Sequence, residues 1–151
     1  MQGDGDMPGS DDSEKDRIAQ RFMAAIPFAR ALTMRLEDVG GGRAVISMPW
    51  DARLVGEPAT GVIHGGAVSA LLDTCGGAAV ISHPDGAGES ATIDLRIDYM
   101  RAATPGQRIT ARAECYHVTR TVAFVRATAE DEADGPPVAT ATGAFTFRRG
   151  A

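Results

Sequence analysis

The spacing of apolar residues changes several times along the chain and divides it into elements. In the segment that begins at Ser13, a residue that can cap a helix, Ile18, Phe22 and Ala25 recur at helical spacing. This pattern predicts a short amphipathic N-terminal helix. Pro27 then stops or kinks the helix, because proline lacks the backbone N–H that a helix interior uses.

Beyond the proline, apolar and polar residues alternate, which is the pattern of strands with one buried face. Alternation over residues 32–36 and 44–48, on either side of the glycines at 40–42, predicts a hairpin. At residues 93–99 the apolar side chains share one face, which we expect to be buried, and the charged side chains share a wet or paired face. Three more strands, separated by turn residues, are predicted at 108–118, 121–131 and 138–148.

Residues 66–80 are apolar almost all round, which is typical of a buried helix. Two strands precede this helix and four follow it, so the chain has too few helices to connect parallel strands repeatedly. We therefore expect an α+β fold, with an antiparallel sheet of about six strands wrapped around this long helix. Residues 13–151 would form a single domain, and residues 1–12, which have almost nothing to bury, a disordered tail.

The composition excludes several classes of function. A net charge of −5, without any run of Lys and Arg, argues against nucleic-acid binding. No apolar run approaches the roughly 20 residues of a membrane span, and the acidic N-terminus is unlike a signal peptide. We therefore expect a cytoplasmic protein that does not enter a membrane. Cys75 and Cys115 lie inside apolar patterns without metal or redox spacing, which predicts reduced core residues.

A histidine and two glycines stand where the long helix begins, in GVIHGG, and AVSALLD follows with a carboxylate on an apolar face. Together with the later segment TIDLRIDYMRAATPG, this sequence resembles the PaaI-type branch of the hotdog-fold acyl-CoA thioesterases over about residues 26–147. The resemblance implies a homo-oligomer, a dimer or a homotetramer built as a dimer of dimers, that hydrolyses an acyl-CoA thioester. No prosthetic group is expected, since CoA enters as part of the substrate. An aryl (phenylacetyl-type) and a medium-chain acyl group both stay open.

By motif position, the resemblance assigns to Gly65 the backbone N–H that polarises the thioester carbonyl, and to Asp73 the role of catalytic carboxylate. His64 and Thr92 would support them, His64 either by capping the helix or by proton transfer. Free N–H groups at a helix start attract developing negative charge, and Gly66 leaves its own amide unobstructed for substrate. A partly desolvated carboxylate can activate water or attack the carbonyl. The alternative for Asp73 is a structural carboxylate satisfied by backbone amides or an arginine.

The spacing of these two residues has a consequence for assembly. The eight residues from Gly65 to Asp73 correspond to about 12 Å of helical rise, so one carbonyl carbon cannot touch both within a single chain. We therefore expect the active site between protomers, with Gly65 of one facing Asp73 of the other.

Charged residues elsewhere supply weaker candidates. CoA carries several phosphate charges, and Arg101 and Arg120, which lie near predicted turns, are candidate contacts. His83 and His117 have no motif around them and are interpreted as surface or turn residues, so no metal site is expected.

Two positions depart from the family pattern. Pro58 stands where an asparagine is often found, six residues before the histidine, and Thr119 stands where a glycine often precedes the arginine of a later turn. A proline cannot supply a side-chain amide, which favours a rival interpretation as a non-catalytic acyl-CoA-binding or sensing hotdog protein. The retained Asp73 favours the enzyme. A hotdog hydratase or dehydratase would need its histidine and carboxylate in another arrangement.

Overall fold

The computed structural model describes Arg17 and residues 21–151, so the predicted tail and most of the predicted N-terminal helix lie outside the described residues. Residues 21–24 are helical. A separate short helix, α2 (Pro27–Ala31), begins at the proline, which the first position of a helix accepts because its N–H needs no partner there. The proline therefore marks the start of a new element as well as the end of the predicted run.

Six strands form one antiparallel sheet in the spatial order β1-β2-β6-β7-β8-β5. Their bounds are β1 (Arg35–Gly40), β2 (Arg43–Met48), β5 (Thr92–Tyr99), β6 (Ile109–Val118), β7 (Val122–Glu130) and β8 (Ala139–Thr146).

Three short elements before the long helix were not predicted. They are the 3-10 turn η1 (Ala52–Leu54) and a two-stranded sheet formed by β3 (Val55–Glu57) and β4 (Val62–Ile63). Strands of three and two residues are too short to show an alternating pattern. The β3–β4 hairpin nevertheless positions the start of the helix, as the site geometry shows.

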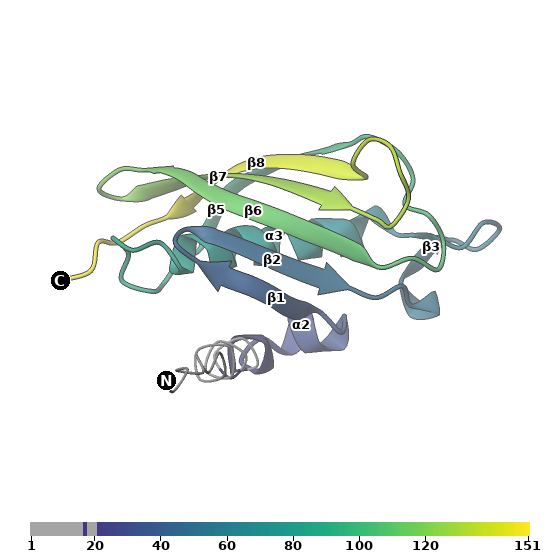
Figure 1. Ribbon diagram of the computed structural model, residues 1–151, viewed down its shortest axis with the longest axis horizontal. Helices are drawn as coiled ribbons and strands as arrows, with labels where there is room; N and C mark the ends of the chain where they lie inside the picture. The colour runs from purple at the N-terminus through teal and green to yellow at the C-terminus, as the bar shows by residue number, and fades with distance from the viewer. Residues whose placement is uncertain (1–16, 18–20) are drawn as a thin grey trace, which may run out of the picture.

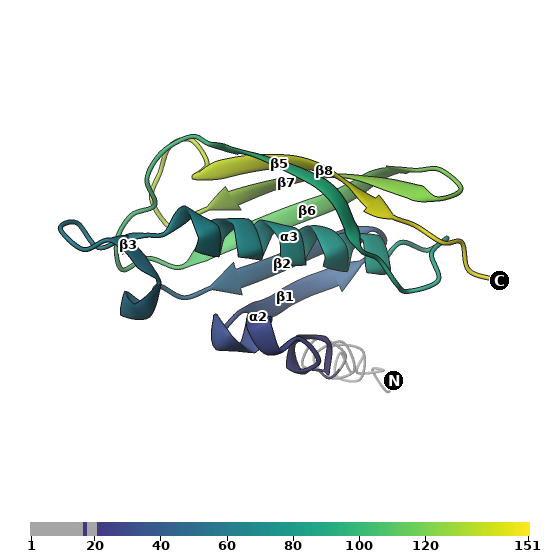
Figure 2. The ribbon, with the colours of Figure 1, turned by 180° about the vertical axis from the view of Figure 1, so that it is seen from behind.

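The long helix, α3 (Gly65–Ile81), lies along one face of the sheet, as Figures 1 and 2 show from the two sides. Leu71, Leu72 and Cys75 on this helix are fully buried. The inward-facing side chains of the strands cover them, so helix and sheet share one hydrophobic core. The expected α+β architecture, six antiparallel strands around one long helix, is confirmed.

The first predicted strand begins later than expected. Alternation starts at Leu32, yet Leu32 caps α2 and Thr33 has a positive φ of 56°, so β1 starts only at Arg35. The hairpin that follows is as predicted. Its turn residues Gly41 and Gly42 have φ values of 60° and 81°, a conformation that glycine adopts without steric cost.

The apolar face of β5 is less buried than predicted. Ile93 and Tyr99 are 57% and 50% exposed, and Leu95 and Ile97 are half-buried. The reason is the position of the strand, because β5 is at the edge of the sheet and pairs with β8 on one side only. A long edge strand with apolar side chains is a surface on which another chain can pair.

Both cysteines are free and buried, as predicted. Burial raises the pKa of the Cys75 thiol to about 12, and it also raises the pKa of Cys115. Reactive cysteines need an accessible thiolate, so neither of these side chains is a candidate nucleophile at neutral pH.

Candidate active site

The first residue of the site, His64, is fixed at the N-cap of α3 by its backbone and by its ring. Its amide donates to the Leu54 carbonyl (2.8 Å), and its Nδ1 accepts from the Gly66 amide (2.8 Å). Gly56 in β3 lies so close that an added Cβ would be 2.8 Å from the His64 Cα. The β3–β4 hairpin therefore holds His64 against the helix start, and the histidine takes the capping position.

The two glycine amides after the histidine differ in availability. The Gly66 amide is occupied by the His64 ring, so it is not free for a substrate while the cap is in place. Among the hydrogen bonds of the described residues, none uses the Gly65 amide. This N–H lies at the positive end of the helix dipole, where a negatively charged oxygen is favoured.

The Gly65 carbonyl, by contrast, is held by side chains. The Tyr99 hydroxyl donates to it (2.8 Å) from the end of β5, and the Ser69 hydroxyl donates to it (3.2 Å) from the next turn of α3. The two hydroxyls also lie within hydrogen-bond distance of each other, so either one can donate to the other instead of to the carbonyl. The sequence pattern did not single out Tyr99 or Ser69 as residues of the site. The one feature that pointed to such a contact was Ser69 itself, a polar residue one turn after Gly65 on an otherwise apolar helix.

Asp73 lies two turns further along α3 and is half-buried. The Thr92 hydroxyl, at the first residue of β5, donates to the Asp73 Oδ1 at 2.6 Å. Oδ2 has no hydrogen-bond partner among the described residues. The carboxylate is therefore oriented through one oxygen and offers the other for chemistry.

The two halves of the site are separated within one chain. Gly65 and Asp73 are eight residues apart on a continuous helix, which corresponds to about 12 Å. Each is in contact with an opposite end of β5, Gly65 with Tyr99 and Asp73 with Thr92. One chain therefore holds an unpaired backbone amide and a carboxylate that cannot contact the same atom.

A hollow of about 250 Å³ adjoins Gly65. Apolar side chains from β4, α3 and the segments that follow β5 and precede β8 line it, together with Tyr99 and Arg101. Such a lining suits an apolar group of a ligand.

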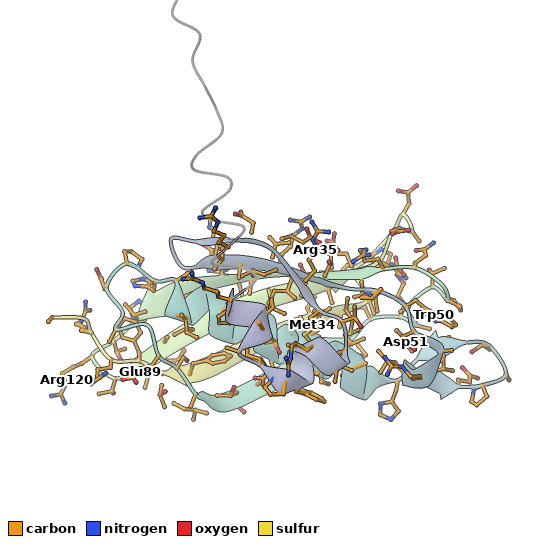
Figure 3. All side chains as sticks on the ribbon, turned by 90° about the horizontal axis from the view of Figure 1, so that it is seen from below. Met34, Arg35, Trp50, Asp51, Glu89 and Arg120 are labelled. Atoms are coloured by element: carbon orange, nitrogen blue, oxygen red, sulfur yellow. The ribbon has the colours of Figure 1, made fainter. Side chains whose placement is uncertain are left out.

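The predicted phosphate-binding arginines lie in different places. Arg101 is tied to Asp131 by two hydrogen bonds of 2.7 Å and donates a third, through Nε, to the Pro136 carbonyl (2.8 Å). Arg120 is exposed in the β6–β7 turn, at the end of the molecule opposite Trp50 and Asp51 (Figure 3). The fold therefore does not bring the two arginines together within one chain.

The remaining histidines do not join this site. The Nδ1 of His83 accepts from the Asp85 amide (3.1 Å), and the ring of His117 stacks on Phe124. Within residues 17 and 21–151, no group of three or more His, Cys, Asp or Glu side chains could hold a metal ion. The same residues include no helix of the length and apolarity that a membrane crossing requires.

The two departures from the family pattern have different structural consequences. Pro58 is exposed in the turn of the β3–β4 hairpin, and its neighbour Glu57 accepts a hydrogen bond from Thr60 (2.9 Å). No side-chain amide is supplied from this turn. Thr119 closes the β6–β7 turn, because its amide donates to the Val122 carbonyl and its hydroxyl accepts from the Val122 amide.

Comparisons with known proteins show which family the chain is similar to. A family model described as the thioesterase superfamily matches residues 60–138. A protein of Halobacterium salinarum, provisionally named an esterase, is 32% identical and the match covers 94% of this chain and 97% of that protein. The medium/long-chain acyl-CoA thioesterase YigI of Escherichia coli is 29% identical, with 76% and 82% covered. A solved structure of a variant of the phenylacetic acid degradation protein PaaI from Thermus thermophilus is 30% identical, with a TM-score of 0.71 and 82% and 99% covered.

Proposed function

Because the chain belongs to the thioesterase superfamily and has the hotdog fold, we propose that it hydrolyses an acyl-CoA thioester in the cytoplasm. Water adds to the thioester carbon, the carbon–sulfur bond breaks, and the products are a free acid and CoA. The reaction needs a base or nucleophile and an oxyanion donor but no prosthetic group.

The observation that carries the proposal is the unpaired Gly65 amide at the positive end of α3, in a chain that also presents the Asp73 carboxylate. In the proposed reaction, the Gly65 N–H binds the carbonyl oxygen as it becomes negative. Asp73 either removes a proton from the attacking water or attacks the carbon itself. Thr92 orients the carboxylate, and His64 holds the helix start.

We further propose that a two-fold dimer completes the site. Antiparallel pairing of two β5 edges would place Tyr99 of one chain beside Thr92 of the partner subunit. Since Tyr99 contacts Gly65 and Thr92 contacts Asp73, Gly65 of one chain would then face Asp73 of the partner subunit. The exposed apolar face of β5 supports this pairing.

The same two-fold dimer would also place an arginine of the partner subunit where CoA would bind. Arg120 lies at the Thr92 end of β5, since Val122 pairs with Thr146 and Thr92 with Phe145. The partner subunit's Arg120 would therefore lie at the Gly65 end of this chain. We propose this exposed arginine, rather than the ion-paired Arg101, as the contact for a CoA phosphate.

The acyl group is proposed to be apolar, either aryl or medium-chain. The apolar hollow beside Gly65 supports this class, as does the medium/long-chain preference in the name of the YigI relative. One observation favours a second function. Because Pro58 supplies no side-chain amide, the site could hold an acyl-CoA without turnover.

Thiol release from phenylacetyl-CoA, hydroxybenzoyl-CoA and aliphatic acyl-CoAs of increasing length tests the enzyme against the binding protein. The native protein is expected to release CoA, and Asp73→Asn to lower kcat by about a hundredfold or more. Asp134→Asn, in the exposed β7–β8 loop, is the matched control and should leave kcat unchanged. Tight acyl-CoA binding by a native protein that releases no thiol would establish the binding function instead.

A further inference from the structure

We propose that Tyr99 and Ser69 are positioning residues, which hold the Gly65 carbonyl and thereby fix the direction of the Gly65 amide. This inference rests on the proposed function, since the amide needs a fixed direction only if it stabilises a negative charge on the substrate.

The contacts around the Gly65 carbonyl carry the inference. The hydroxyls of Tyr99 and Ser69 lie 2.8 and 3.2 Å from this oxygen and also bond to each other. Three oxygens therefore share two hydroxyl protons, and in every arrangement at least one hydroxyl donates to the carbonyl. The Tyr99 ring covers the glycine as well, because an added Cβ on Gly65 would be 3.4 Å from its Cε1.

The helix start needs such a restraint. Gly65 and Gly66 are consecutive residues without side chains, so their backbone has the greatest conformational freedom. The peptide group between them is held at its N–H by the His64 ring and at its carbonyl by Tyr99 and Ser69. The preceding peptide is held at its own carbonyl, which accepts from the Ala67 amide (3.0 Å). The N–H and carbonyl of one peptide group and the carbonyl of the other are thus all hydrogen-bonded. The Gly65 N–H is therefore held in a single direction.

The two hydroxyls come from different elements. Ser69 is part of α3, whereas Tyr99 is the last residue of the exposed edge strand β5. A restraint from the sheet edge thus reaches the oxyanion donor. Pairing of β5 with a partner subunit would stiffen it further.

Tyr99→Phe and Ser69→Ala each remove one hydroxyl and keep the packing. Each variant is expected to lower kcat between about threefold and thirtyfold while KM stays within about twofold, because the donor is misdirected but substrate binding persists. The double variant should be clearly more impaired than either single variant, since each single variant keeps one hydroxyl that can still donate to the carbonyl. Ser69→Thr retains a hydroxyl and should recover native kcat.

Tyr116→Phe is the matched control. Tyr116 is the second tyrosine of the chain, 46% exposed, and stacks under Arg126 away from α3. Its loss of a hydroxyl should leave kcat unchanged.

A native kcat in both Tyr99→Phe and Ser69→Ala would overturn the inference, as would an equal loss in Tyr116→Phe. If Tyr99→Phe changes the oligomeric state, Ser69→Ala decides, because Ser69 lies on the helix and not at the sheet edge. Amide hydrogen exchange of Gly66, whose N–H belongs to the same peptide group as the Gly65 carbonyl and is bonded to the His64 ring, gives a second readout and should become faster in both variants. If the native protein shows no turnover, the proposed function fails, and unchanged exchange would reject the positioning role independently.

Discussion

Asp131 is a buried carboxylate whose charge is balanced by neighbouring donors. Its side chain is 0% exposed, and Arg101 donates a hydrogen bond of 2.7 Å to each of its oxygens. The amides of Thr104 and Ala133 add bonds of 2.9 and 3.0 Å. The Arg101 hydrogen bonds above all hold the pKa of Asp131 well below its ordinary value. This one residue therefore joins the segments that follow β5 and β7.

We expect Asp131→Asn to lower the free energy of unfolding at pH 7 by about 2 kcal/mol, because the partly exposed Arg101 guanidinium loses its counter-charge and a charge-assisted hydrogen bond within the buried Asp131 site is weakened. The loss depends on pH. Folding lowers the pKa of the Asp131 carboxyl below its unfolded value of about 3.9. Above that pH the carboxylate contributes its full stabilisation to the folded state. This contribution is lost as the pH falls from there toward the folded pKa. Urea unfolding of both proteins from pH 7 down to about pH 3 should show the difference narrowing.

The control for this experiment is Asp134→Asn in the same loop, which should change stability little at any pH. A stability difference for Asp131→Asn that stays constant with pH would contradict the role assigned to its charge.

Helix α3 approaches the sheet closely where its glycines face the strands. A Cβ on Gly76 would lie 2.9 Å from the Cζ of Phe145, a β8 side chain that is 1% exposed. A Cβ on Gly77 would meet nothing within 4 Å outside the helix. The two adjacent glycines therefore differ in their structural role. Gly76 allows the close approach of the helix to the sheet, whereas no packing contact outside the helix requires a glycine at position 77.

Gly76→Ala and Gly77→Ala are expected to change stability in opposite directions. The first should lower the free energy of unfolding by about 1–3 kcal/mol, because the packed Phe145 ring must shift. The second should raise it by up to about 1 kcal/mol, because alanine has the higher helix propensity. Chemical denaturation of the two variants measures the change in the free energy of unfolding and its sign for each. Stabilisation by both substitutions would mean that Phe145 moves at no cost.

At the scale of the whole molecule, the proposed catalytic groups lie at opposite ends of one edge strand. The Gly65 end of α3 meets the end of β5, and the Asp73 carboxylate meets its beginning. Two chains related by a two-fold axis perpendicular to this strand would form two equivalent sites, each with one group from either chain.

Mixing two inactive variants tests this arrangement. Gly65→Pro removes the amide proton at the first position of α3, where proline is accepted, and His64 before it is already extended (φ −60°, ψ 134°). Asp73→Asn removes the carboxylate. Co-refolding equal amounts should give about half hybrid dimers with one complete site each, and so about a quarter of native activity. Hybrid dimers that are detected by mass and remain inactive would place the site within one chain.

Local sequence patterns were sufficient for most of the architecture. Apolar spacing predicted a helix at 66–80, where α3 spans Gly65–Ile81, and alternation together with turn residues predicted every strand of the main sheet. The resemblance to PaaI-type hotdog thioesterases, based on GVIHGG and the aspartate that follows, is confirmed by the matches to this superfamily. Both kinds of signal are local, since periodicity and motifs need only neighbouring residues.

The sequence by itself therefore determined the long helix and the strands of the main sheet, the family, and the candidate residues Gly65 and Asp73. The tertiary structure alone decided that β5 is an exposed edge, that Arg101 is held by Asp131, and that Tyr99 and Ser69 hold the Gly65 carbonyl. The physical reason is distance along the chain. Tyr99 is 34 residues from Gly65 and Arg101 is 30 from Asp131, so their contacts depend on how the sheet closes around the helix, which no local periodicity encodes.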